Sequence, residues 1–185
     1  MTTSPAHYAR PVVGLHWAIA LLIFAALPLG VYMGDLPLSP DKLRLFSYHK
    51  WIGVTVFVLS LLRVAARVAF APPALPEAMP RWEQSAAVAM HALLYALIFV
   101  VPLSGWVMSS ATGFQTVWFG VLPLPDLVGK KKELAESLKL LHKNLNIVIV
   151  VLIIVHVTAA LKHHVIERDA VLARMLAWRR RPRRC

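Results

Sequence analysis

Residues 138–163, with the sequence LKLLHKNLNIVIVVLIIVHVTAALKH, decide the fold of this chain. From Asn144 to Leu161 no side chain is charged, which is the pattern of a helix that crosses a membrane. The stretch also holds His142 and His156, and membrane helices rarely carry titratable groups without a function. Their spacing in an α-helix corresponds to about 40° around the axis and roughly 21 Å along it. The two imidazoles thus share one face at two depths, and each could bind one axial position of a separate haem if other helices supply a second histidine.

The whole chain has the composition of an integral membrane protein. Of its 185 residues 58% are hydrophobic and the mean hydropathy is +0.64, which is too apolar for one soluble domain of this length. Charge-free runs predict four membrane spans in a single domain over residues 1–185, at about 12–33, 45–68, 86–109 and 138–163. The stretch 110–126 is apolar but interrupted by glycines and prolines, so we expect an interfacial loop there and not a fifth span.

The division of charge between the two sides predicts the orientation. With four crossings, the side that holds both termini has twelve basic and four acidic residues, and the other side has eight basic and five acidic residues. Because basic residues concentrate on the cytoplasmic side, we expect a multi-pass protein of the bacterial inner membrane with both termini in the cytoplasm. The arginine-rich end of the chain is attributed to this bias and to anionic membrane lipid, so nucleic acid is not expected as a partner.

Six histidines fall into two layers when depth is assigned from this orientation. The outer, periplasmic layer contains His49 and His142. The inner layer contains His16, His91, His156 and, at its margin, His163. Because the chain has a single cysteine, Cys185, any metal cofactor must use histidine. The layers predict an all-α, four-helix transmembrane bundle that encloses two b-type haems, each with two histidine ligands.

Small residues and one arginine agree with this arrangement. Gly53 lies one turn beyond His49, and Gly105 is expected at the same outer depth, so both leave room for an outer haem. Arg63 follows His49 by fourteen residues and therefore faces the same way at the inner level. It either pairs with a haem propionate or extends to the cytoplasmic headgroups.

Several short motifs carry a resemblance to a known family. They are Gly14-Leu15-His16-Trp17, the run YHKWIG from Tyr48 to Gly53, the arginine at 63, Met90-His91, the run PLSG from Pro102 to Gly105, Leu141-His142, and the run from His156 to His164. Over nearly the whole chain this set resembles bacterial cytochrome b561, and most of all the small free-standing type that is similar to membrane-bound superoxide oxidase. The wider superfamily includes the cytochrome b subunits of nickel hydrogenases and formate dehydrogenases. The resemblance implies that haem iron is bound by His16 with His156 and by His49 with His142.

Two further histidines have several possible roles. His91 is a substitute inner ligand, a hydrogen-bond partner in a quinone pocket, or a core histidine with satisfied hydrogen bonds. His163 caps the end of its helix or binds a quinone carbonyl. We favour the quinone role for both.

Two redox centres at different depths predict electron transfer between the periplasmic side and the quinone pool, with ubiquinone as an exchangeable substrate. The resemblance implies an oxidoreductase of the superoxide:ubiquinone type, which oxidises superoxide to dioxygen. Its outer face is basic and would attract a small anion through Lys50, Lys130, Lys131, Lys132 and Lys143. Each of these lysines could instead bind a haem propionate or a lipid phosphate.

A competing interpretation makes the chain a cytochrome b electron-transfer subunit or shuttle. It would then serve a periplasmic dehydrogenase or a soluble cytochrome, with that protein as the one-electron donor. The sequence has no large extramembrane domain, which favours an independent enzyme. A histidine-lined metal transporter and a purely structural bundle are disfavoured, because neither explains the matching helical phase of His142 and His156.

Overall fold

The computed structural model describes residues 7–74, 79–169 and 171–176. Its main elements are four long helices, α1 (Arg10–Asp35), α2 (Pro40–Ala69), α3 (Arg81–Thr112) and α4 (Lys132–Val165). All four are long and apolar enough to cross a membrane, and each extends beyond the predicted span at both ends. The fold is therefore the all-α, four-helix membrane bundle that the sequence predicts.

Local sequence explains where these helices begin and end. At the start of α2, the Oγ of Ser39 accepts a hydrogen bond of 3.2 Å from the backbone N–H of Lys42, and Pro40 occupies the first helical position. Helix α3 ends at Gly113, whose φ of 81° is in the left-handed region that glycine adopts without strain.

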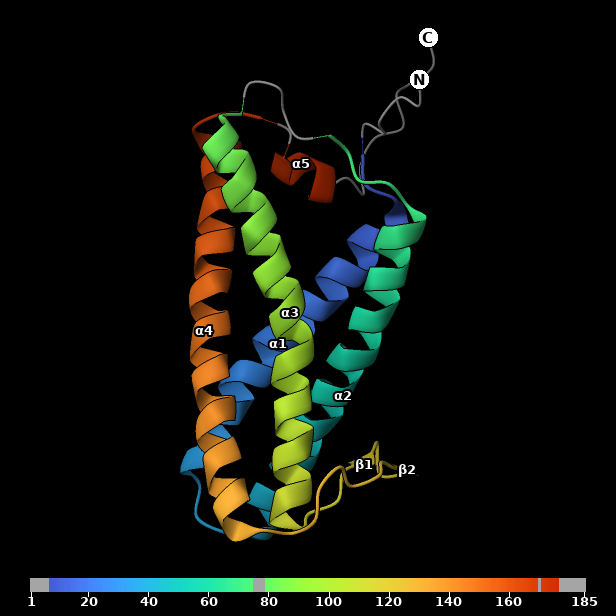
Figure 1. Ribbon diagram of the computed structural model, residues 1–185, viewed down its shortest axis with the longest axis vertical. Helices are drawn as coiled ribbons and strands as arrows, with labels where there is room; N and C mark the ends of the chain where they lie inside the picture. The colour runs from blue at the N-terminus through green and yellow to red at the C-terminus, as the bar shows by residue number, and fades with distance from the viewer. Residues whose placement is uncertain (1–6, 75–78, 170, 177–185) are drawn as a thin grey trace.

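The four helices pack in sequential pairs. Helix α1 packs against α2, α2 against α3 and α3 against α4, whereas α4 has little backbone contact with α1 or α2 within the described residues (Figure 1). A cluster around Leu97 and Ile98 of α3 and Ile149 of α4 holds α3 and α4 together. Among the described residues, helix α4 therefore has its main backbone contacts with α3, and its histidine side chains reach those of α1 and α2.

The two ends of the bundle differ in what covers them. At one end, where α1 begins and α4 ends, lies the short helix α5 (Val171–Leu176), and we call this the α5 end (Figure 1). The indole N–H of Trp17 donates to the carbonyl oxygen of Met175 at 2.9 Å and so attaches α5 to α1. The arginines between 179 and 184, which contribute to the predicted orientation, lie outside the described residues.

The opposite end, called the hairpin end, carries strands β1 (Val117–Trp118) and β2 (Leu122–Pro123), which pair antiparallel (Figure 1). The prediction of a loop over 110–126 is therefore only partly right, because residues 110–112 continue α3 and a hairpin follows. Two indole hydrogen bonds fix the hairpin to α2, one donated by a residue of α2 and the other by a residue of β1. The indole of Trp51 donates to the Val117 carbonyl at 2.7 Å, and the indole of Trp118 donates to the Thr55 hydroxyl at 3.2 Å.

Candidate functional site

Two histidines meet near the hairpin end. His49, nine residues into α2, and His142, ten residues into α4, have ring centroids 6.4 Å apart and nearly perpendicular planes at 88°. These are the two members of the predicted outer layer.

A second pair meets near the α5 end and has the same spacing. His16 of α1 and His156 of α4 have ring centroids 6.4 Å apart, with an angle of 80° between the planes. The third inner histidine, His91 of α3, contacts His156 at a closer 5.4 Å and is exposed. The structure thus brings together the same two pairs that the family resemblance implies.

The spacing of both pairs fits a shared metal ion. A metal bonded at about 2.0 Å to one nitrogen of each ring, together with the half-width of each imidazole, requires ring centres roughly 6 Å apart. The 5.4 Å between His91 and His156 is shorter than either of the paired distances. Both 6.4 Å pairs also join α4 to helices with which it has little backbone contact among the described residues. The donors present, imidazole nitrogens in an apolar bundle, are those that bind haem iron in bis-histidine cytochromes.

Two glycines make room for the hairpin-end pair. A β-carbon at Gly30 of α1 would stand 3.0 Å from Cε1 of His49, and one at Gly105 of α3 would stand 3.1 Å from Cε1 of His142. Sequence reasoning singled out Gly105 but missed Gly30. Gly53, which was expected to leave room for a haem, differs from both, because a β-carbon there would have no neighbouring atom within 4 Å among the described residues.

The Nδ1 atoms of His49 and His142 have different environments. The Nδ1 of His142 lies 2.8 Å from the Oγ of Ser104 in α3. The Nδ1 of His49 is buried and has no hydrogen-bond partner within the described part of the chain. Ser104 belongs to the PLSG motif, but sequence reasoning gave it no role, because only the tertiary packing of α3 on α4 brings it to His142.

Arg63 of α2 lies in the interior near the α5 end. Its Nε donates to the hydroxyl of Tyr95 in α3 at 3.1 Å, and its guanidinium carbon lies 5.4 Å from the centre of that ring. Its Nη1 is buried and has no partner among the described residues. A buried guanidinium nitrogen with a free hydrogen suits an anionic oxygen, such as a haem propionate.

His163 takes part in a charged network at the α5 end. Its Nδ1 lies 2.8 Å from a carboxylate oxygen of Asp169 and 2.5 Å from one of Glu167. Lys162 bridges Glu167 and Glu83 at 2.7 and 2.9 Å, which ties the end of α4 to the start of α3. Its hydrogen bond to Glu167 holds the pKa of that carboxyl below the usual range. His163 therefore joins the last turn of α4 to the carboxylates that follow this helix.

Of the five lysines that were expected to attract an anion, the structure brings two to the same turn at the hairpin end. The Nζ of Lys50 donates to the carbonyl of Phe114 at 2.9 Å, and the side chain of Lys130 packs against Gly113. Both therefore meet at the turn that follows α3. Three further lysines are exposed at the start of α4 or beside His142: Lys131, Lys132 and Lys143.

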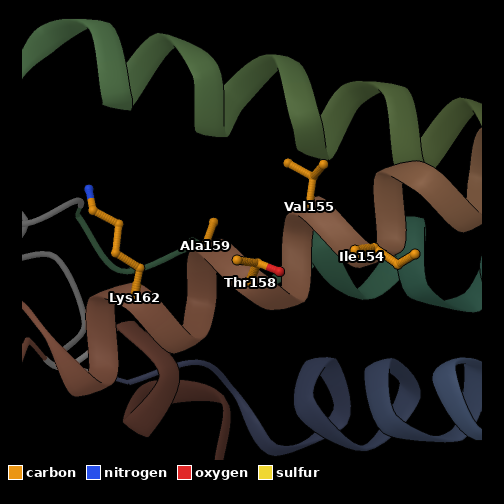
Figure 2. Close-up of a pocket in the computed structure, with 5 residues that line it drawn as sticks. All are labelled: Ile154, Val155, Thr158, Ala159 and Lys162. Carbon is orange, nitrogen blue, oxygen red and sulfur yellow. The ribbon is translucent and has the colours of Figure 1, made fainter.

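A pocket of about 320 Å³ lies on the surface of α4 (Figure 2). It is lined by Ile154, Val155, Thr158, Ala159 and Lys162, and Figure 2 shows Val155 directed toward α3. The histidine pairs do not contribute to this lining. The pocket therefore excludes the paired imidazoles, although Ala159 in its lining lies about one turn beyond His156.

Comparisons with known proteins give the family. The prokaryotic cytochrome b561 family matches residues 7–178. The chain is 33% identical over 177 residues to cytochrome b561 homolog 2 of Escherichia coli K12, which covers 95% of this chain and 94% of that protein. It is 28% identical over 177 residues to cytochrome b561 homolog 1 of the same strain, covering 94% and 98%. It is 28% identical over 184 residues to the probable superoxide oxidase CybB of Yersinia pestis, covering 94% and 97%. The resemblance in the sequence motifs is thereby confirmed, and the chain belongs to the prokaryotic cytochrome b561 family.

Proposed function

We propose that this chain is a di-haem membrane oxidoreductase that oxidises superoxide to dioxygen on the periplasmic side and reduces ubiquinone. Family membership makes it a membrane electron-transfer protein that binds b-type haem. The observation that carries the proposal is the presence of two histidine pairs, each with ring centroids 6.4 Å apart, at opposite ends of one bundle. Two equal sites at two depths are the arrangement that electron transfer across a membrane needs.

The residues take the following roles in this proposal. His49 and His142 hold the outer haem, and His16 and His156 hold the inner one. The bound haems supply the one-electron chemistry. The buried Nη1 of Arg63 binds a propionate oxygen near the α5 end, which is a role in the interior and not at the headgroups.

The electron donor is proposed from charge and from one relative. Superoxide is a small anion, and Lys50 and Lys130 meet at one turn of the hairpin end, in the half of the bundle that holds His49. Such a basic surface raises the local concentration of anions. A relative that covers nearly the whole chain is named a probable superoxide oxidase. The overall reaction consumes two superoxide ions, one ubiquinone and two protons, and it yields two dioxygen molecules and one ubiquinol.

The acceptor is proposed to bind near the α5 end. His91 is exposed on α3 and contacts His156, which supports a role as hydrogen-bond donor to a quinone carbonyl that enters from the lipid. His163 has its Nδ1 engaged by two carboxylates, which leaves only its other ring nitrogen for a quinone. We therefore assign the quinone contact to His91 before His163.

A second candidate is electron transfer for a partner protein, as a cytochrome b subunit or shuttle. It is favoured by the names of other relatives, which describe cytochromes and specify no substrate: two cytochrome b561 homologs of E. coli and a cytochrome b562 of Cereibacter sphaeroides that is 29% identical over 181 residues. In that case a soluble periplasmic cytochrome or dehydrogenase would replace superoxide.

One experiment separates the two functions. Purified protein is mixed with superoxide in a stopped-flow spectrometer, with and without superoxide dismutase, and reduction of the haem bands is followed before and after addition of a short-chain ubiquinone. Superoxide oxidation predicts rapid haem reduction that the dismutase abolishes and ubiquinone reverses. Haems that superoxide leaves oxidised, but that a soluble cytochrome or dehydrogenase reduces, would favour the second function.

A further inference from the structure

Ser104 makes two hydrogen bonds beside the ring of His142, which also interacts with the backbone carbonyl of Val101. The side chain is 7% exposed in α3, one residue before Gly105. Its Oγ donates to the carbonyl oxygen of Val101 at 2.7 Å and lies 2.8 Å from the Nδ1 of His142. Both partners are held by helices that pack on each other, so the hydroxyl has little freedom to choose other partners.

The number of hydrogens fixes the direction of the second bond. A serine hydroxyl has one hydrogen, and here Val101 receives it. The contact with His142 is then a hydrogen bond only if Nδ1 carries a hydrogen and Oγ accepts it. A neutral imidazole has one N–H, so Nε2 of His142 keeps its lone pair. Nε2 is the nitrogen that remains to bind a metal.

The partner of His142 lacks such support. The Nδ1 of His49 has no hydrogen-bond partner among the described residues, although it is buried. Its ring lies against Gly30 and beside the backbone carbonyl of Ala26, both in α1. The two histidines of the hairpin-end pair therefore differ in one respect: within the described residues, a serine hydroxyl lies beside the Nδ1 of His142 and none lies beside that of His49.

From this geometry we propose that Ser104 is a positioning residue that fixes the tautomer of His142 and lowers the midpoint potential of the haem at the hairpin end. A hydrogen bond from Nδ1–H to an acceptor makes the imidazole a stronger electron donor to the metal. Stronger donation favours the oxidised iron, which carries more positive charge. The bond from Ser104 to Val101 polarises the hydroxyl and makes its oxygen a better acceptor. The proposal rests on the ligation of haem by His142 stated above.

The test is a spectroelectrochemical titration of the purified holoprotein and three variants. Ser104→Ala removes the hydroxyl, and Ser104→Thr keeps one. Ser47→Ala is the matched control, because Ser47 lies two residues before His49 but, within the described part of the chain, its hydroxyl bonds only to the carbonyl of Leu43 in its own helix. The titration component of the hairpin-end haem is identified by its loss in His142→Ala.

We expect Ser104→Ala to raise the midpoint potential of that one component and to leave the other unchanged. Ser104→Thr is expected to restore the wild-type midpoint potential of that component. Ser47→Ala is expected to have wild-type midpoint potentials for both haems. If Ser104→Ala loses the haem altogether and Ser104→Thr retains it, the hydroxyl is likewise shown to be required. Unchanged potentials in Ser104→Ala, or loss of the haem in both Ser104 variants, would overturn the proposal. A wild-type protein with no haem at His142 would instead contradict the proposed function itself.

Discussion

Gly30 of α1 lies against the imidazole of His49 in α2, so closely that a β-carbon at position 30 would stand 3.0 Å from Cε1 of the ring. Gly105 of α3 has the same relationship to His142, at 3.1 Å. Each histidine of the hairpin-end pair is thus backed by a glycine of a different helix. These glycines allow close approach of helix and imidazole.

Gly30→Ala is therefore expected to displace His49 and lower occupancy of the haem at the hairpin end. Forcing a methyl group into such a contact costs about 1–3 kcal/mol, which is enough to shift the ring or the helix. Gly34→Ala is the control, since a β-carbon at Gly34 would have no described atom within 4 Å and alanine favours the helix over glycine by about 1 kcal/mol. The measurement is the haem content per chain and the α-band spectrum. Equal haem occupancy in the two variants would show that the contact at Gly30 is not critical.

Replacement of single histidines is expected to remove one haem at a time. The wild-type chain should contain two haem b, and His142→Ala should lose the one at the hairpin end while it keeps most of the other. His16→Ala should do the reverse. His164→Ala is a suitable control, because His164 is exposed and lies outside both pairs. A pyridine haemochrome assay that finds one haem per wild-type chain would refute the assignment of two sites.

The sequence predicted the fold and part of the site for identifiable reasons. Long charge-free runs are a property of the chain itself, and so is the helical phase that places His142 and His156 on one face. The contacts of Gly30 with His49 and of Ser104 with His142 are different, because they depend on how separate helices pack. Single-sequence periodicity carries no information on such packing.

The same limit explains the connection between α3 and α4. Its glycines and prolines predict an irregular segment, and Gly120 does adopt a left-handed φ of 72° in the turn of the hairpin. The pairing of β1 with β2 depends further on the indole hydrogen bonds of Trp51 and Trp118, which join residues more than sixty positions apart. Tryptophan side chains favour the membrane interface, and these two also fix the hairpin to α2.

Arg63→Gln is expected to lower the midpoint potential of the haem near the α5 end. Removal of a buried positive charge stabilises the oxidised form of a nearby metal centre. Tyr95→Phe, which removes only the hydroxyl that accepts from Nε, should have a smaller effect in the same direction. Arg44→Gln is the control, because Arg44 is exposed near the start of α2, at the opposite end of the bundle. An unchanged potential in Arg63→Gln would support the alternative in which this side chain reaches toward the lipid headgroups.

The orientation in the membrane is expected to place both termini in the cytoplasm. The prediction rests on the excess of basic residues on the side that holds the termini. A C-terminal fusion to alkaline phosphatase should be inactive, whereas a C-terminal fusion to a green fluorescent protein should be fluorescent. The reverse pattern would exchange the sides of the two histidine pairs and place the hairpin end in the cytoplasm.

Charge at the hairpin end is expected to control the rate at which superoxide reduces the haems. Conversion of Lys130, Lys131 and Lys132 together to glutamine should slow this reaction, because an anion responds to the summed charge before it makes contact. The loss should be largest at low ionic strength, since the screening length is only about 10 Å at 0.1 M salt. Haem content and the absorption spectrum should stay unchanged.

A matched triple variant at the other end of the bundle gives the control for this steering. Arg63 is excluded because of its proposed contact with a propionate, so the variant combines Arg67→Gln, Arg81→Gln and Arg174→Gln. It removes the same number of positive charges at the α5 end. Stopped-flow rates across a salt series should then show a reduced salt dependence for the lysine variant alone. Equal rates and equal salt slopes in both variants and the wild type would mean that Lys130, Lys131 and Lys132 do not guide the anion. Lys50, which meets the same turn as Lys130, would then be the next residue to test.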